Sequence, residues 1–492
     1  MYSTALWLGW VYAFFKCVYF STAALPLIFK RELMERNLIS ADAPRRRSQM
    51  EGVKWPPVLV GEHAVLAALL AELETTQWLP QAVIEQRQAQ QLAVLIRHHV
   101  RHSPLFAERF KAAGRRAEKS DSIARLRAIA PLTRHELQSA GPSFFAKQVP
   151  RSHMPAAMVQ SSGSTGEPVE IRKTGLNQLF FMAFGFRDNF WYRRNFLSRM
   201  MSIRSHVEAI GEFDEWAAPT SDLFESGPSQ DIPIETDIER QARLIEKFKP
   251  EILLLYPNNL SALLTLWETG RFKIPPLKHI KTIAETVSED LRVRTMKITG
   301  LRIEDVYSSE EVGTIAIQCP ESGLYHIMAE ALIVEVIDDK GEPCKEGQIG
   351  RVVVTDLHNF ASPMIRYVNG DHAEVGGTCS CGRGLPTLRR ILGRERNLLV
   401  KPDGTRHWPP IGLIKFQEVA PVRQFQFIQH SVDRIELKIA TDEEISAADA
   451  EGVCRLAREA LGTEFNIELV QSRERLPSGR NGKYEEFICR VT

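Results

Sequence analysis

The sequence has few cysteines and almost no net charge, and these two shortages exclude several kinds of protein. Seven cysteines in 492 residues are too few for a disulfide framework, and their number is odd. We therefore expect the body of the protein to be reduced and cytosolic. The 62 lysines and arginines almost cancel the 61 aspartates and glutamates, which leaves a net charge of +1. This balance gives nucleic acid no general electrostatic reason to bind, so we predict no nucleic-acid partner.

The sequence also shows no internal repeat and no low-complexity tract, and its one long apolar stretch is at the N-terminus. Residues 4–15 and 17–29 are almost entirely apolar, with Lys16 between them. Together they are long enough to cross a bilayer, which takes about 20 residues. A spanning anchor, a helix in the interface and a hairpin packed on the protein remain open, whereas a cleaved signal peptide fits less well because no positive charge precedes the run. We predict a cytoplasmic protein that is associated with the membrane surface through this segment.

From about residue 154 onward, patterns typical of strands and helices alternate. Strands are expected at 156–160, 251–255, 280–284, 330–337, 349–355 and 363–367, and helices at 238–248, 260–267 and 289–298. A helical pattern also covers residues 81–114. Strands separated by helices of this length predict a largely parallel sheet that is covered on both faces.

A second, smaller unit is expected after Gly393. It has strand patterns at 424–430, 433–440 and 465–470, and a helix at 447–461 with Ser446 as N-cap and Gly462 as its stop. We therefore predict four regions: an apolar segment (1–30), a lead-in of unassigned role (31–80), a large α/β domain (81–393) and a small, mobile α+β domain (394–492). The hinge is expected at 394–397.

A small-residue loop follows the first strand of the large domain. It reads Ser161-Ser162-Gly163-Ser164-Thr165-Gly166-Glu167-Pro168. Small residues let the backbone approach a polyphosphate, and hydroxyl and amide groups can donate to its oxygens. Such a loop alone is weak evidence, because most loops of this composition bind nothing.

Four further segments support a phosphate-binding role for this loop, and they follow it in a definite order along the chain. They are Tyr307-Ser308-Ser309-Glu310-Glu311, Ser362–Tyr367 running into Gly370-Asp371, Gly393-Arg394, and Gly482-Lys483 near the end. In this order the segments resemble the adenylate-forming superfamily, in the branch of phenylacetate–CoA ligase and the capsular-polysaccharide CapK-type proteins. The resemblance covers roughly residues 85–490, including the stretches RHSPLFAERF and PLTRHEL. It implies a large ANL-type adenylating domain, with mixed and parallel sheets and flanking helices, and a small α+β C-terminal domain.

The resemblance implies a role for each motif residue in binding ATP. Ser161, Ser162, Gly163, Ser164, Thr165 and Gly166 would hold the phosphates, Tyr307 would stack on adenine, and Glu285 would lie in a turn beside it. Ser308 would also belong to the nucleotide-binding residues. Glu311 would bind Mg²⁺, Asp371 would accept hydrogen bonds from the ribose, and Arg394 would assist. Lys483 would stabilise the negative charge that develops when a carboxylate attacks the α-phosphate. The implied enzyme is an AMP-forming acid–thiol ligase, with a small carboxylic acid and coenzyme A as substrates.

Some positions depart from the family pattern. Glu167 stands where such loops commonly carry lysine, Glu310 replaces a phosphate-contacting threonine, and Arg396 replaces a hinge carboxylate. These departures support an alternative from another class, a membrane-tethered scaffold without catalysis. Among enzymes, a carrier-protein thiol, an amine or a sugar hydroxyl remains an alternative acceptor. Phe180, Phe181, Phe184 and Trp191 could make the acid pocket apolar, which would favour an aromatic or fatty acid.

Three cysteines and a histidine form a candidate metal site in the same region. Cys319 and His326 are followed by Cys379 and Cys381, with Gly and Pro residues suited to tight turns between them. Three thiolates and one imidazole make a closed tetrahedral set typical of structural Zn²⁺, with no open position for catalysis. The alternative is that these are separate buried residues. Cys17, Cys344, Cys454 and Cys489 have no expected partners.

Overall fold

The computed structural model describes residues 44–114, 123–160, 168–394, 398–407, 416–474, 476 and 486–491. The apolar segment 1–30, residues 161–167, 395–397 and Lys483 lie outside these ranges. Predictions that rest on residues 161–167, 395–397 and Lys483 therefore stay predictions, and every structural statement below concerns the described residues.

Helices dominate the first hundred described residues. They are α3 (Gly61–Thr76), α4 (Gln81–His102), α5 (Pro104–Ala112), α7 (Ile123–Arg127) and α8 (Arg134–Ser139), followed by two 3₁₀ turns at Gly141–Phe144 and Arg151–His153. The single helical pattern expected over 81–114 is divided at Ser103. Its hydroxyl accepts a hydrogen bond from Phe106 N, and proline occupies the first position of α5, so the sequence itself starts a new helix there.

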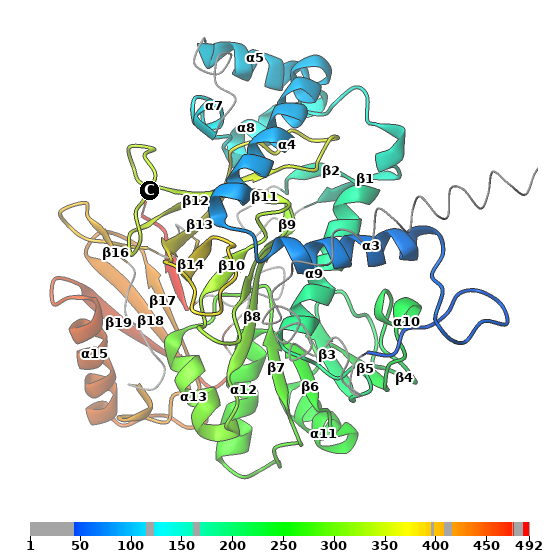
Figure 1. Ribbon diagram of the computed structural model, residues 1–492. Coiled ribbons are helices and arrows are strands. Elements are labelled where there is room, and N and C mark those ends of the chain that lie inside the picture. The colour runs from blue at the N-terminus through cyan, green and yellow to red at the C-terminus, as the bar shows by residue number, and fades with distance from the viewer. Residues whose placement is uncertain are drawn as a thin grey trace, which may run out of the picture.

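One twelve-stranded sheet forms the centre of the molecule (Figure 1). Its strands in chain order are β3 (Met200–Arg204), β4 (Gly211–Phe213), β5 (Ser229–Pro233), β6 (Ile252–Leu255), β7 (His279–Thr282), β8 (Ile303–Ser309), β9 (Gly313–Gln318), β10 (Tyr325–Ile327), β11 (Leu332–Ile337), β12 (Ile349–Asp356), β13 (Tyr367–Val375) and β14 (Thr387–Arg394). Their order across the sheet is β11-β12-β13-β14-β10-β9-β8-β7-β6-β3-β5-β4. Strands β5, β3, β6, β7 and β8 are parallel neighbours, whereas β8–β14 and β4 add antiparallel pairs.

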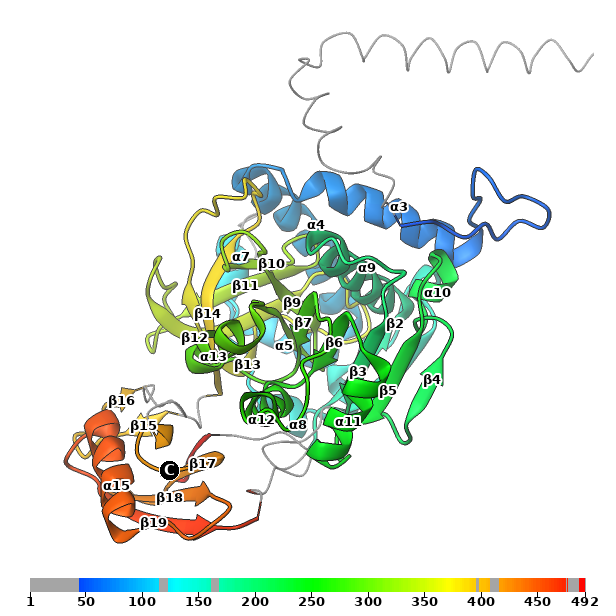
Figure 2. The same cartoon turned by 90° about the horizontal axis from the view of Figure 1, so that it is seen from below.

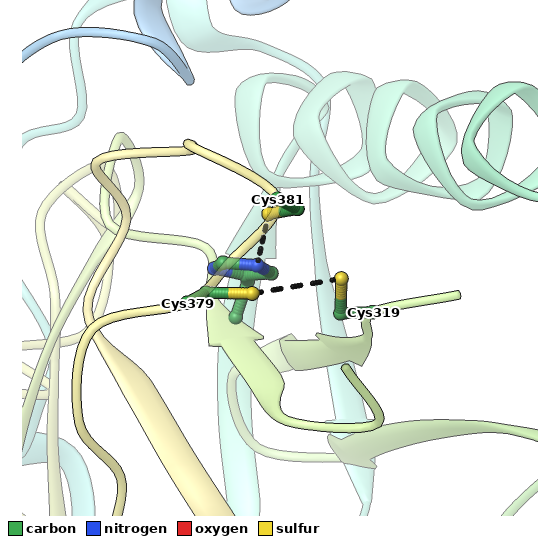
Figure 3. Close-up of side chains that lie close together, drawn as sticks. Cys319, Cys379 and Cys381 are labelled. Carbon is green, nitrogen blue, oxygen red and sulfur yellow. Dashed lines mark hydrogen bonds between the residues drawn. The ribbon is translucent and has the colours of Figure 1, made fainter. Parts of the chain in front are cut away.

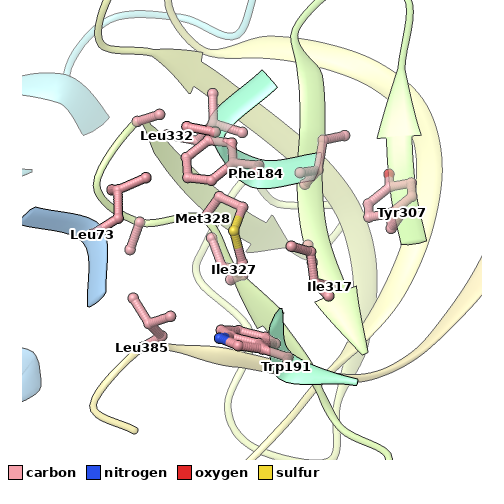
Figure 4. Packing of buried hydrophobic residues seen from close by; sticks show 14 of the residues in the cluster. Leu73, Phe184, Trp191, Tyr307, Ile317, Ile327, Met328, Leu332 and Leu385 are labelled. Atoms are coloured by element: carbon pink, nitrogen blue, oxygen red, sulfur yellow. The ribbon is translucent and has the colours of Figure 1, made fainter. Parts of the chain in front are cut away.

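Helices cover both faces of the parallel part, as the sequence predicts. Helices α11 (Ile238–Phe248), α12 (Pro257–Glu268) and α13 (Glu289–Thr299) pack on one face, in a core that includes Met201 and Ile203 of β3. Helices α9 (Gly175–Trp191) and α3 take part in a second core, shown in Figure 4, where Leu73, Phe184 and Trp191 surround Met328. The short helix α10 (Thr220–Leu223) and the hairpin of β1 (Ala156–Gln160) and β2 (Glu170–Thr174) complete the large domain.

The strand expected at 363–367 is wrong. Residues 363–366 form a buried loop, and β13 begins only at Tyr367. Pro363 has no N–H to donate to a strand partner, and Arg366 has a φ of 54°, in the left-handed region. The apolar run that resembles a strand is therefore buried as a loop.

The C-terminal part is a small unit with its own sheet and core (Figure 2). It contains β15 (Leu399–Val400), β16 (Arg406–His407), β17 (Gln424–Gln429), β18 (Arg434–Ala440), α15 (Ala447–Leu461), β19 (Asn466–Ser472) and β20 (Phe487–Cys489). Four strands pair in the order β19-β18-β17-β20, and α15 packs on them through a core that includes Val453 and Leu461. The domain limits given above remain predictions.

The prediction of membrane association is wrong. Within the described ranges, no helix has both the length and the apolar character needed to cross a bilayer. The longest, α4, has 22 residues but carries Gln, Arg and His side chains along its length, and α3 carries three glutamates in 16 residues. The segment 1–30, on which the prediction rested, lies outside the described residues.

Candidate active site and metal site

The predicted nucleotide-binding residues gather beyond the C-terminal ends of the parallel strands. Strand β3 ends at Arg204, β6 leads into Tyr256, β7 leads into Ala284 and Glu285, and β8 contains Tyr307 near its end. Because these strands are parallel neighbours, their carboxyl ends meet at one edge of the sheet. In open α/β sheets this edge is where ligands bind.

Tyr307 and Asp371 are brought together by a buried hydrogen-bond network. The Tyr307 hydroxyl donates to Asp371 Oδ2 at 2.8 Å, and the Asn369 amide donates both to that hydroxyl (2.7 Å) and to Asp371 Oδ2 (3.0 Å). Burial, followed by the charge of Asp371, raises the pKa of Tyr307 well above its usual range, so the hydroxyl remains a donor. The network fixes the Asp371 carboxylate in one orientation.

Arg394 holds the other oxygen of the same carboxylate. Its Nε lies 3.2 Å from Asp371 Oδ1, and its NH1 donates to the Asn369 carbonyl at 3.2 Å. Gly370 makes this approach possible, because its φ is +85° and a Cβ there would lie 3.1 Å from Arg394 NH1. The structure thus brings Tyr307, Asp371 and Arg394 into one cluster, as the motif order predicts.

Glu311 lies beside this cluster and is paired with an arginine that the sequence analysis did not assign. It is buried in the turn between β8 and β9, and its Oε1 lies 3.3 Å from NH1 of Arg134, the first residue of α8. The two residues are 177 positions apart. The stretch PLTRHEL, which contains Arg134, was the available signal. Asn369 was missed as well, although it stands two residues before Asp371.

Glu285 is bound to the start of helix α12. Its Oε2 accepts a hydrogen bond from the backbone N–H of Asn258 at 3.1 Å, where the unpaired amides of the first turn favour a carboxylate. The preceding Ala284 has a φ of 68°, which turns the chain sharply after β7. Ser308, by contrast, is exposed beside a register shift between β8 and β9. Glu285 and Ser308 therefore both lie at the edge of the sheet where β7 and β8 end.

The remaining predicted residues cannot be placed against this cluster. Ser161, Ser162, Gly163, Ser164, Thr165, Gly166 and Lys483 are all outside the described residues, and so are Glu167 and Arg396. Glu310 is described, and its side chain is exposed.

Most of the aromatic residues proposed for the acid pocket belong to the core. Phe184 and Trp191 are buried in the cluster of Figure 4, and Phe180 packs against it. Phe181 alone is exposed, at 51%, and it lies near Gly313 at the start of β9. The aromatic stripe on α9 therefore gives no support to an aromatic or fatty acid, because its spacing serves packing between α9 and the sheet.

The candidate metal ligands lie together, as Figure 3 shows for the three thiols. Cys319 follows β9, His326 lies in β10, and Cys379 and Cys381 lie in the loop between β13 and β14. All four side chains are buried, and their ligand atoms lie within 4.8 Å of one another. The Sγ atoms of Cys379 and Cys319 are 3.7 Å apart, and His326 Nε2 is 3.2 Å from Cys381 Sγ.

These distances fit a shared metal ion and do not fit a disulfide. A tetrahedral zinc ion with bonds of about 2.3 Å separates two sulfur ligands by roughly 3.8 Å, close to the Cys319–Cys379 distance. His326 Nδ1 lies 3.3 Å from the Leu385 carbonyl, which would orient the ring with Nε2 toward the thiols. The Ser322 hydroxyl lies 3.0 Å from Cys379 Sγ. The donor set and its burial are therefore appropriate for zinc.

The loop that carries Cys379 and Cys381 also contacts the junction of α3 and α4. Gly384 N donates to the Gln77 carbonyl at 2.9 Å, and the Gln77 side-chain oxygen accepts from Arg383 Nε and Trp191 Nε1, both at 2.9 Å. A Cβ at Gly384 would lie 1.7 Å from the Leu79 carbonyl oxygen, so only glycine allows this contact. The candidate metal site thus lies beside a loop that contacts both the junction of α3 and α4 and the end of α9.

Comparison with known proteins gives matches in both parts of the chain. Residues 413–490 match the family model described as the CapK C-terminal domain. A phenylacetate-coenzyme A ligase from Thermus thermophilus is 31% identical over 221 residues, which are 42% of this chain and 48% of that protein. The match therefore spans about half the length of that relative. A phenylacetate-coenzyme A ligase from Pseudomonas putida is 26% identical over 357 residues, 69% of this chain and 76% of that protein.

Solved structures match over most of the chain. A 2-hydroxyisobutyryl-CoA ligase in the postadenylation state, bound to 2-HIB-AMP, has a TM-score of 0.66 at 18% identity and covers 84% of this chain and 90% of its own. An open conformation of that ligase, with 2-HIB-AMP and CoA, has a TM-score of 0.53 at 17% identity, with coverage of 83% and 92%. These likenesses establish the fold.

Proposed function

Because the chain belongs to the adenylate-forming superfamily, in the branch of phenylacetate–CoA ligase and CapK-like proteins, we propose that it is an AMP-forming acid–thiol ligase. It uses ATP to convert a carboxylic acid into an acyl-adenylate, and it transfers the acyl group to a thiol, for which we propose coenzyme A. The observation that carries this proposal is the buried arrangement of Tyr307, Asp371 and Arg394 beside Glu311.

The Asp371 carboxylate is suited to bind the two ribose hydroxyls of ATP. Oδ2 is held by Tyr307 and Asn369 and Oδ1 by Arg394, which leaves Oδ1 with capacity to accept a further hydrogen bond. A carboxylate fixed in this way is oriented before the nucleotide arrives, so little conformational freedom is lost on binding. We assign Asp371 as the ribose-binding residue and Tyr307, Asn369 and Arg394 as its supports.

Glu311 is suited to bind Mg²⁺ with the ATP phosphates. Its one observed ion pair is a single 3.3 Å contact to Arg134, which leaves a carboxylate oxygen for a hard cation that prefers oxygen ligands. The cation would neutralise phosphate charge. Arg134 would keep the Glu311 side chain turned toward the cluster when ATP is absent.

Two chemical steps follow from this assignment. In the first, an oxygen of the substrate carboxylate attacks the α-phosphorus of ATP and pyrophosphate leaves, which gives the acyl-adenylate. In the second, the thiol sulfur attacks the acyl carbon, AMP leaves, and the thiol proton passes to solvent. We assign Lys483 to the first step, where its ammonium group would stabilise charge on the pentacoordinate phosphate, and residues 161–166 to the triphosphate.

We also propose that Cys319, His326, Cys379 and Cys381 hold a structural zinc ion. Four protein ligands complete its coordination, so it takes no part in either chemical step. Its role would be to join the β9–β10 turn to the β13–β14 loop.

The match of residues 413–490 to the CapK C-terminal domain supports a second acceptor class. A sugar hydroxyl could replace the thiol in the second step without any change in the first. The two candidates differ in one measurement, because the acyl-adenylate would be consumed by coenzyme A in one case and persist in its presence in the other.

The test of the proposed function is ATP–pyrophosphate exchange by the full chain, across a panel of aryl, fatty and dicarboxylic acids. We expect exchange with at least one class of acid, and a loss of about 10²–10³-fold in Lys483→Ala. The matched control is Lys297→Ala, which removes an exposed lysine of α13 and should leave exchange unchanged. Absence of exchange with every acid, or equal rates in Lys483→Ala and wild type, would contradict the proposal.

A further inference from the structure

One face of the parallel strands carries buried charges among its apolar side chains. Met201 and Ile203 of β3 pack into the core beneath α11 and α12, so Ser202 and Arg204 point to the opposite face. The register places Lys281 of β7 and Glu304 of β8 side by side on that same face. Helix α9 and the residues after it, with Asp188 and Arg194, cover it.

Almost every charge on this face has a partner. Arg194 pairs with Asp188 at 2.6 Å and with Glu304 at 2.5 Å, Lys281 pairs with Asp188 at 2.6 Å, and His279 contacts Glu304 at 2.6 Å. The Asp231 carboxylate accepts a hydrogen bond from the Ser202 hydroxyl at 2.5 Å. On the β7 and β8 side of this face, each of these charged groups therefore has a partner of opposite charge.

Arg204 is the exception among the described residues of this face. Its Nε is buried without a hydrogen-bond partner, and its side chain forms no ion pair. Burial lowers the pKa of Arg204 despite the opposing influence of Asp231 and Tyr256, so the surrounding groups do not compensate for the lost hydration. The Arg204 side chain is only partly buried, so its guanidinium is accessible to a ligand while its Nε has no hydrogen-bond partner in the protein.

Arg204 also stands at the edge where a ligand is expected. It is the last residue of β3, opposite Tyr256 after β6, and the next residue, Ser205, contacts the Tyr256 hydroxyl through both its N–H (3.3 Å) and its Oγ (3.0 Å). Asn258, whose N–H binds Glu285, lies two residues past Tyr256. Arg204 therefore lies at the same edge of the sheet as Tyr307 and Glu285, on the side of β3.

We propose that Arg204 lies in the acid pocket and binds a second carboxylate, at the far end of the substrate from the carboxylate that is adenylated. This inference rests on the proposed function, and it names the substrate class as dicarboxylic acids. A guanidinium presents Nε and a terminal nitrogen as a fork that matches the two oxygens of a carboxylate. The ligand carboxylate would supply the direct partner that Arg204 Nε lacks, while Lys281, already paired with Asp188, lies nearby.

The experiment compares pairs of acids that differ only in the second carboxylate, namely hexanoate with adipate and phenylacetate with 4-carboxyphenylacetate. ATP–pyrophosphate exchange is measured for wild type, Arg204→Met and Arg204→Lys. We expect wild type to favour the dicarboxylate of at least one pair by about tenfold or more in kcat/KM, because a hydrogen bond to a charged group has that strength. Arg204→Met should reverse the preference, and Arg204→Lys, which keeps the charge and loses the fork, should retain part of it.

A binding measurement provides a readout besides turnover. With a non-hydrolysable ATP analogue present, adipate should raise the melting temperature of wild type and should leave that of Arg204→Met unchanged. The matched control is Arg240→Met, which removes an exposed arginine of α11 and should behave as wild type in both assays. If Arg204→Met does not fold, the comparison of Arg204→Lys with wild type carries the test.

The outcomes separate this inference from the proposed function. Exchange with monocarboxylic acids in preference to their dicarboxylic partners, or an equal effect of Arg204→Met on both members of each pair, overturns the inference and leaves the proposed function standing. Exchange with no acid of any kind overturns the proposed function, and the inference with it.

Discussion

Asp371 and Arg394 are cross-strand partners in β13 and β14, and Arg394 Nε lies 3.2 Å from Asp371 Oδ1. Arg394 is also the first residue of the predicted hinge at 394–397 and the only one of the four that the structure describes. The side chain that orients the proposed ribose-binding carboxylate is therefore adjacent to the chain that leads into the C-terminal unit. A change of backbone angle at the predicted hinge would shift the Asp371 side chain through its ion pair with Arg394.

The hydroxyl of Tyr307 gives the sharpest test of the ribose assignment. Tyr307→Phe removes the donor to Asp371 and should raise KM for ATP about tenfold, with little change in kcat, because a hydrogen bond to a charged acceptor is lost and no reacting group is touched. Steady-state exchange over a range of ATP concentrations measures both constants. Tyr192→Phe, which removes a hydroxyl bonded to the Gln318 carbonyl away from the cluster, is the control. An unchanged KM in Tyr307→Phe would contradict the assignment.

Glu311 should determine the requirement for magnesium. Glu311→Gln keeps the size of the side chain but removes its charge, so the Mg²⁺ concentration for half-maximal exchange should rise by about tenfold or more. Titration of Mg²⁺ at fixed ATP measures this shift. Glu321→Gln, an exposed glutamate beyond β9, should titrate as wild type. If both variants follow the wild-type curve, Glu311 does not bind the metal.

The thiol cluster should contain one zinc ion per chain. Elemental analysis of the purified protein is expected to give this stoichiometry, and Cys381→Ser should lower both the zinc content and the melting temperature. Cys454→Ser, in α15 and outside the cluster, should change neither. A metal-free protein that melts at the same temperature after treatment with a chelator would show that the four residues are only packed together.

The protein should lose stability as the pH falls below neutrality, because of buried histidines. Burial, together with the nearby His98 and His102, lowers the pKa of His99 to about 3, and burial lowers that of His358 to about 4. The unfolded chain takes up a proton on each below pH 6.5, whereas the folded protein does not until the pH reaches those values. Each depressed pKa therefore contributes stability that is present above pH 6.5 and lost as the pH falls toward 4.

His99→Gln isolates this effect. Between pH 6.5 and pH 4 one such histidine accounts for about 3 kcal/mol of the free energy of unfolding, and this part of the pH dependence should disappear in the variant. Urea unfolding at several pH values gives the slope. His135→Gln, which removes an exposed histidine of α8, is the control and should keep the wild-type slope. Equal slopes in all three proteins would mean that His99 is protonated in the folded state.

Local sequence signals predicted the regular elements well where capping residues are present. The helix expected at 447–461 is α15, with the same bounds, and the Ser446 hydroxyl accepts from Asp449 N at 3.1 Å. Helix α11 also has the predicted bounds, Ile238–Phe248. In both helices the capping residue is adjacent in sequence to the helix whose start it determines. The bounds of these helices can therefore be predicted without knowledge of distant parts of the chain.

The site could be predicted only in part, because its geometry depends on distant residues. The motif order singled out Tyr307, Glu311, Asp371 and Arg394, which the structure brings close together, and the four candidate metal ligands also lie together. Nothing local to Arg134 indicates that its partner is 177 residues away. The lack of a partner for Arg204 Nε likewise depends on the side chains of the neighbouring strands β5 and β6 and of the elements packed on them. Burial and the absence of a partner are properties of the assembled sheet.

The separation between Arg134 and Glu311 also has a consequence for synthesis of the chain. A ribosome adds about 5–20 residues per second, so the 177 residues between them take roughly 10–35 s to appear. During that interval α8 and its neighbours are exposed without their final partner. The N-terminal helices must therefore remain soluble on their own, or be shielded by other proteins, until the turn after β8 has emerged.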